Sequence, residues 1–196
     1  MLLDFATNGC PVNDGDNWSR QQLDDYLAYD NHASAKHPAA ATAVRTEALA
    51  KVKDGSCFLV NWEDIKHNPP PNLKISPLAA IPHKSRDYRM ILDLSFTMRT
   101  PTNTHHQPVN AIPAHPAVPT HSMAELGNVL RRIVWTLATT HDTRPFFFCK
   151  VDLKDGFWRL FVQDEAHWNF AHILPRLSST DPLQLVVPRS FNGLAR

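Results

Sequence analysis

Apolar residues recur at helical spacing in three stretches of the chain. The first begins after Ser19, where Gln22 follows three residues later as in a capping box. The second begins at Pro38, a residue suited to a first helical turn, and ends at Gly55. The third begins at Ser122, with a glutamate three residues later. Its expected apolar stripe is Met123, Leu126, Leu130, Ile133, Val134 and Leu137.

Two apolar, β-prone segments, SPLAAIP and YRMILDLS, flank the polar sequence HKSRD. They predict an antiparallel β-hairpin in which residues 76–82 pair with residues 88–95. The basic residues expected near its tip are Lys84, Arg86 and Arg89.

Further apolar runs predict a sheet. SCFLVNW indicates a short strand before the break HNPPPN at residues 67–72. FFFCKVDL is aromatic and apolar throughout, which is typical of a buried strand, and it ends at Asp152. Three more strand candidates follow: FWRLFVQ, WNFAHIL and LQLVV.

The order of these elements, helices first, then a hairpin, a helix and a sheet, predicts an α+β fold. We divide the chain into an N-terminal helical region at 1–73, a hairpin, loop and helix at 74–140, and a partial sheet domain at 141–196. The HNPPPN break marks the first division.

Composition and charge limit the classes of protein to which this chain could belong. The formal net charge is only +1, whereas a chain that grips a nucleic-acid backbone by itself is usually more basic. The three cysteines are far apart, so a disulfide framework or a cysteine zinc site is not expected. No signal peptide or long apolar run is visible, and we expect an intracellular protein, cytoplasmic or nuclear, without a membrane partner.

The carboxylates that are candidates for metal binding follow the buried strand. A strand end is a common place for a carboxylate that binds Mg²⁺, because the strand fixes its position. Asp152 stands at that end, and Asp155 follows three residues later. The alternative is an ordinary turn with Asp155 and Gly156 at its tip, and the spacing alone leaves both interpretations open.

Two segments resemble the reverse transcriptases of retroelements and retroviruses. KVDLKDGFWRL resembles motif A of the palm, and SPLAAIPHKSRDYRMILDLS resembles the fingers hairpin that precedes it. The order of hairpin, loop, helix and motif A also matches, over about residues 74–193. The resemblance implies a partial fingers and palm fold, with primer–template and dNTP as partners.

The resemblance also implies roles for residues of motif A. Asp152 would be a catalytic ligand of both Mg²⁺ ions, and the backbone carbonyl of Leu153 would be a further ligand. Phe157 would lie under the incoming sugar and exclude a 2′-hydroxyl. Without the family, Phe157 is equally well a plain core residue.

In the hairpin, Lys84 and Arg89 match the two basic residues that bind the triphosphate. Exposed charges on a solvated tip are the alternative for this pair. Asp93 fits a structural or template-contact position of the same hairpin.

The sequence departs from the family in two places. Either Arg189 and Ser190 stand where the family usually has glutamine and glycine, or the pattern is shifted to Asn192 and Gly193. In addition, no aromatic-x-Asp-Asp motif occurs. We therefore expect an N-terminal fragment of a reverse transcriptase that binds Mg²⁺ weakly and does not polymerise DNA alone.

Two other interpretations remain: a non-catalytic remnant or interaction module that binds nucleic acid or a protein weakly, and an unrelated binding domain with an accidental motif. The many histidines of the 97–120 loop region and its flank lack the spacing of a zinc site, and we interpret them as exposed. They are His105, His106, His115 and His121.

Overall fold

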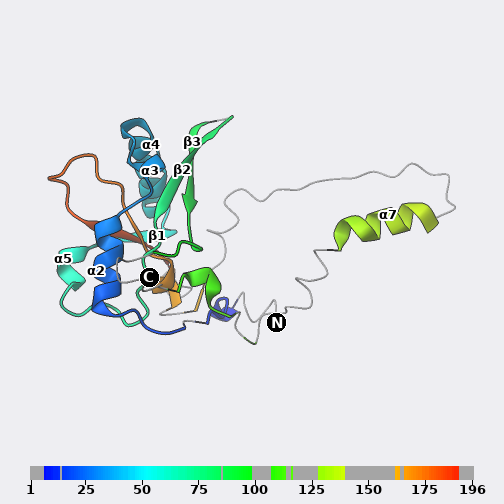
Figure 1. Ribbon diagram of the computed structural model, residues 1–196, viewed down its shortest axis with the longest axis horizontal. Helices are drawn as coiled ribbons and strands as arrows, with labels where there is room; N and C mark the ends of the chain where they lie inside the picture. The colour runs from blue at the N-terminus through cyan, green and yellow to red at the C-terminus, as the bar shows by residue number, and fades with distance from the viewer. Residues whose placement is uncertain are drawn as a thin grey trace.

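The computed structural model describes residues 7–13, 15–84, 86–98, 107–113, 116, 128–139, 162–163 and 166–189. Within them, helices and antiparallel sheets are mixed, which confirms the α+β class. Figure 1 shows the helices gathered around two sheets, with one helix lying apart. Among the described residues, no helix has the length and apolar character needed to cross a bilayer.

The two N-terminal helices predicted from the sequence are present. α2 spans Arg20–Tyr29, and its capping box is complete, because Ser19 and Gln22 each bond the other's backbone N–H. α4 spans Pro38–Lys53, with the proline in its first turn. It ends before Gly55, whose φ of 82° suits a residue without a Cβ. The short α3, Ala33–Lys36, joins them.

A three-stranded antiparallel sheet has the order β1-β5-β4. β1 is Cys57–Asn61 and β5 is Gln184–Pro188, so the strands predicted at SCFLVNW and LQLVV are confirmed. The one-turn helix α5, Trp62–Ile65, follows β1 directly.

The strand predicted for WNFAHIL is mostly wrong. Ala166–Phe170 forms the 3-10 helix η3, and only His172–Ile173 forms a strand, β4. The Asn169 side chain explains the difference, because its amide donates to the carbonyl of Ala166 within the turn. The side-chain oxygen of Asn169 accepts a 2.6 Å hydrogen bond from the ammonium group of the buried Lys74.

The second sheet is the predicted hairpin. β2 spans Leu78–His83 and β3 spans Arg86–Leu92, and they pair antiparallel from Leu78 opposite Leu92 to His83 opposite Arg86. Side chains alternate between the two faces of a strand. The face with Ala80 and Met90 packs on α3 and α4.

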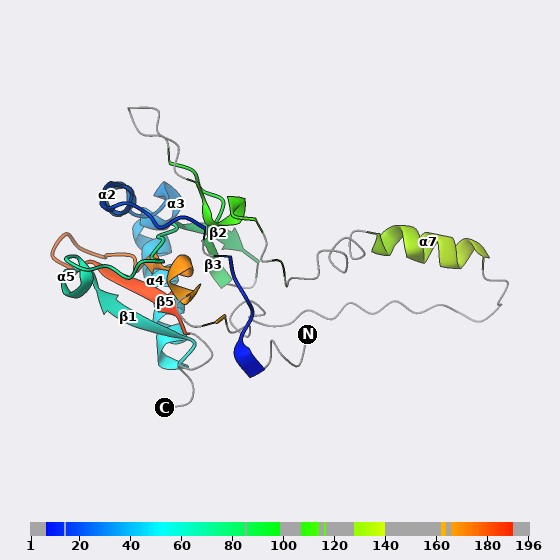
Figure 2. The same cartoon turned by 90° about the horizontal axis from the view of Figure 1, so that it is seen from below.

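The two faces of the β1-β5-β4 sheet carry different clusters. Leu185 and Val187 pack with Leu23 and Tyr26 of α2, whereas Val186 packs with Ala48 of α4. The sheet therefore lies between α2 and α4, as the two views in Figures 1 and 2 indicate. Leu73 and Ile75 join the α2 cluster, so residues on both sides of the HNPPPN break share one core. The divisions at 73 and 140 stay predictions.

α7, Val129–Thr139, lies within the helix predicted after Ser122. Both views show it apart from the two sheets. The 3-10 helix η1, Val109–Ala111, lies in the region predicted to be irregular. The strand predicted at FFFCKVDL lies outside the described residues, as does FWRLFVQ except for its last two residues.

Candidate functional site

The hairpin places its basic residues as expected from the sequence. Lys84 follows β2 in the turn and is exposed. Arg89 lies opposite Ile81 in the register, directly next to the inward-facing pair of Ala80 and Met90 and thus on the outer face. Both side chains are exposed, so they are accessible to an anionic ligand. Of Arg86, only the backbone position opposite His83 is described.

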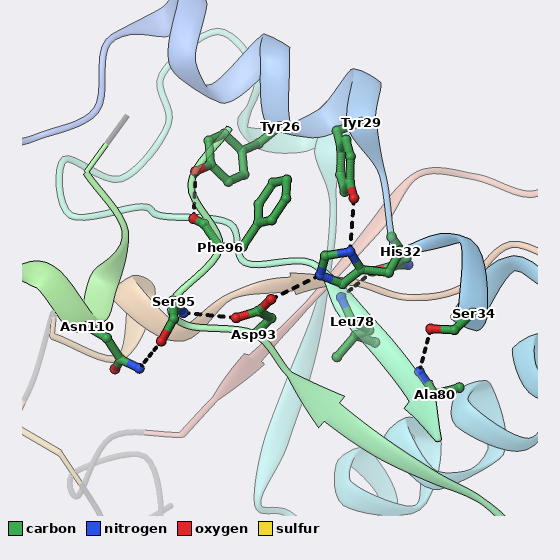
Figure 3. Close-up of polar contacts among 11 residues, drawn as sticks. Tyr26, Tyr29, His32, Ser34, Leu78, Ala80, Asp93, Ser95, Phe96 and Asn110 are labelled. Atoms are coloured by element: carbon green, nitrogen blue, oxygen red, sulfur yellow. Dashed lines mark hydrogen bonds and ion pairs between the residues drawn. The ribbon is translucent and has the colours of Figure 1, made fainter. Parts of the chain in front are cut away.

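The segment between α2 and α3 attaches to the first strand of the hairpin. The His32 amide donates to the Leu78 carbonyl over 2.9 Å. The Ala80 amide donates to the hydroxyl of Ser34 over 3.2 Å (Figure 3). The N-terminal helices therefore supply part of the hydrogen bonding at the edge of β2, which holds the hairpin in place.

Asn31 joins the two sheets. Its side-chain oxygen accepts a 2.8 Å hydrogen bond from the Leu78 amide at the start of β2. Its side-chain nitrogen donates to the carbonyl of Ile173 in β4 over 3.1 Å. The residue is 2% exposed, so both bonds lie away from water, where the loss of a hydrogen-bond partner lowers the free energy of unfolding most.

A second set of contacts holds the end of the hairpin. Asp93, directly after β3, bonds His32 Nε2 over 3.1 Å and accepts the Ser95 amide over 3.1 Å. The Tyr29 hydroxyl lies 2.9 Å from His32 Nδ1 (Figure 3). The Asp93 carboxylate thus has a structural partner, which agrees with the structural role considered for it in the sequence.

The contacts from Tyr29 to Asp93 run through both nitrogens of the His32 ring. Burial, with a smaller contribution from the charge of Asp93, raises the pKa of the Tyr29 phenol. The phenol therefore keeps its proton at neutral pH, and the Tyr29 hydroxyl and the Asp93 carboxylate each bond one ring nitrogen of His32.

Aromatic rings surround the segment after Asp93. Phe96 lies with its ring centroid 4.6 Å from that of Tyr29, 5.1 Å from that of His32 and 5.8 Å from that of Tyr26. The Tyr26 hydroxyl also donates to the Phe96 carbonyl, as Figure 3 shows. This packing fixes the path of the chain as it leaves the hairpin.

The residues assigned to motif A are not placed. Asp152, Leu153 and Phe157 lie outside the described residues. The described part of the chain holds no group of three or more His, Cys, Asp or Glu side chains that could bind a metal ion. A carboxylate and a backbone carbonyl are oxygen donors of the kind that Mg²⁺ prefers, so the proposed ligands suit the ion in type.

Sequence reasoning missed the contacts of Asn31 and His32 altogether. Both residues stand in a polar connection between helices, where no periodic pattern marks a buried side chain. The buried amide of Asn31 needs partners, but those partners are backbone groups of strands far along the sequence. A polar pair inside a short helix connection was the one available signal.

Comparisons with known proteins add no assignment. No family model, no curated protein and no solved structure matches this chain.

Proposed function

We propose that this chain carries the fingers hairpin and the first palm motif of a reverse transcriptase. Complete enzymes of that family extend DNA on an RNA or DNA template by two-metal nucleotidyl transfer. The observation that carries the proposal is the hairpin itself. The segment that resembles the fingers pairs as β2 and β3, with Lys84 in its turn and Arg89 exposed on its outer face.

In the proposed site, the hairpin cations bind the triphosphate. Lys84 offers a compact charge at the tip, and Arg89 offers a planar fork that pairs with two phosphate oxygens. The hydrogen bonds from Asn31 and His32 to Leu78 support this role, because a hairpin that holds a ligand in a defined position must itself be fixed in place.

Motif A supplies the other half of the proposed site. Asp152 and the carbonyl of Leu153 would hold Mg²⁺, which would supply positive charge for the primer hydroxyl and the pyrophosphate. Phe157 would close the space beside the sugar C2′ atom, so that deoxynucleotides are preferred.

Nucleotide binding tests the proposal. We expect titration of wild-type chain with Mg²⁺·dTTP to show weak, salt-sensitive binding, because the site is open and the phosphates are charged. Replacement of both Lys84 and Arg89 by alanine should weaken it at least about tenfold. Lys53→Ala is the matched control, since Lys53 is an exposed lysine in the last turn of α4. Equal losses in the double variant and the control would refute a triphosphate site on the hairpin.

A second candidate is a non-catalytic interaction module. The exposed apolar side chains of α7, among them Val134 and Leu137, favour it because such side chains are usually covered by a partner. In that case Asp152→Asn would leave every binding activity of the chain unchanged, whereas the polymerase site requires a loss of Mg²⁺-dependent nucleotide binding.

A further inference from the structure

α7 presents two unlike faces. Val129, Ile133 and Leu137 follow one another at intervals of four residues and form an apolar stripe. Arg131 and Trp135 are also four residues apart, and Arg132 and Trp135 are three apart, so these three lie together on a different side. The helix sequence VLRRIVWTLAT contains no acidic residue.

Trp135 is the unusual member of this second face. Its side chain is 67% exposed, although tryptophan is normally well buried. It stands two residues from both Ile133 and Leu137, so it does not extend the apolar stripe. A large aromatic ring therefore projects to solvent between two exposed arginines.

We propose that the face formed by Arg131, Arg132 and Trp135 binds single-stranded nucleic acid. Each unpaired base has an aromatic face that stacks on an indole ring, and the flanking guanidinium groups pair with the backbone phosphates. The inference deepens the proposed function and rests on it for the biological strand, a template or primer, while its site is separate from the hairpin.

The position of Trp135 distinguishes this partner from two others. A helix that lies on a membrane surface places its tryptophan with the apolar residues, whereas Trp135 stands among the arginines. A protein that docks by burial of apolar side chains would use the stripe of Val129 and Leu137. An aromatic ring between cations on an acid-free helix is instead suited to a flexible polyanion with stacking bases.

The test is binding of a fluorescent oligothymidylate of about 20 nucleotides to the full chain, followed by anisotropy at low salt. Trp135→Ala should weaken binding about five- to 150-fold, the range of stacking on one aromatic ring. Trp135→Phe should keep most of the affinity. Arg131→Ala should reduce the slope of log affinity against log salt by about 0.7, the value for one phosphate of a single strand. Leu137→Ala is the matched control, because Leu137 is 42% exposed on the apolar side of the same helix.

Parallel titrations separate the alternatives. Heparin bound with the same dependence on Trp135 would overturn the stacking contact and leave a general polyanion site. Vesicles of phosphatidylserine bound through Trp135 in place of the oligonucleotide would assign the face to membranes and overturn the proposal. Absence of oligonucleotide binding in wild type, or equal binding by Trp135→Ala, would also overturn it. Lys84→Ala/Arg89→Ala should keep the oligonucleotide affinity within about twofold, so that failure of the dTTP site and failure of the α7 face are read separately.

Discussion

Asn31 illustrates how one residue determines the relation between two sheets. Its side chain accepts a hydrogen bond from the first amide of β2 and donates one to a carbonyl of β4, and both bonds are buried. Asn31→Ala leaves these backbone groups without partners, and we expect a loss of about 2–4 kcal/mol in the free energy of unfolding. Urea denaturation followed by circular dichroism measures it.

Asn110→Ala is the control for this substitution. Asn110 bonds the Ser95 hydroxyl in an exposed position, where water replaces the lost contact. We expect a loss below about 1 kcal/mol. Similar losses in the two variants would show that Asn31 does not join the sheets in solution.

His172 makes stability depend on pH. The residue is fully buried in β4, and within the described part of the chain neither ring nitrogen has a hydrogen-bond partner of standard geometry. Burial lowers the pKa of His172 to about 4, and the backbone of Phe170 offsets part of that shift. The unfolded chain, with a histidine pKa of about 6.5, binds the proton more readily. Stability from this residue is therefore complete above about pH 6.5 and is lost as the pH falls towards 4, by about 3 kcal/mol in total.

A leucine at this position tests that dependence. His172→Leu should be more stable at pH 4.5 relative to wild type than it is at pH 7.5, because leucine takes up no proton. The exposed His67→Leu is the control, and the carboxylates common to all variants cancel in the comparison. An unchanged difference between wild type and His172→Leu at the two pH values would mean that His172 is not buried in its neutral form.

None of these residue-level contacts was predictable from the sequence. The Asn31 side chain meets residues 47 and 142 positions away, so no local pattern contains both partners. His172 stood inside an apolar run, and the run indicated a buried strand without indicating how its histidine would be buried. Lys84 and Arg89 were predictable in position because a tight hairpin fixes its own tip and alternation.

At the scale of elements, the sequence predicted helices and strands correctly where a short local motif specifies them. The Ser19 capping box, the proline at the start of α4 and the alternation of the hairpin each determine structure within a few residues. The strand predicted at WNFAHIL was mostly wrong, because an apolar run of that length does not distinguish a strand from a helical turn. Here the side chain of Asn169 stabilises the turn. The motif A strand stays a prediction.

The cap of α2 gives a prediction at this scale. Ser19→Ala removes the acceptor for the Gln22 amide and should lower the free energy of unfolding by about 1 kcal/mol. The effect should extend to the Tyr26 and Tyr29 contacts with Phe96, because both tyrosines stand on α2. Thr42→Ala, in which a hydroxyl bonds its own helix, should change stability by less than about 0.5 kcal/mol. Equal stabilities in thermal melts of Ser19→Ala and Thr42→Ala would contradict the cap.

At the scale of the molecule, the N-terminal helices pack against both the hairpin and the three-stranded sheet. Tyr26 of α2 and Leu73 and Ile75 beyond the break pack in one cluster, and α4 packs on both the hairpin and the sheet. The division predicted at the proline-rich break stays a prediction, and the sequence contained no information about which apolar faces meet across the break. Long-range packing therefore decides the arrangement of the two sheets.

The proposed function requires Asp152 and the hairpin cations to bind one and the same nucleotide. Titration of Mg²⁺·dTTP into wild type, Arg89→Ala, Asp152→Asn and the double variant tests it most directly, because two contacts with one ligand give coupled losses. We predict that each single substitution weakens binding, that the two losses are not additive, and that the effect of Asp152→Asn disappears when EDTA removes Mg²⁺. Wild-type affinity in Asp152→Asn with Mg²⁺ present would contradict the shared site and with it the assignment to reverse transcriptases.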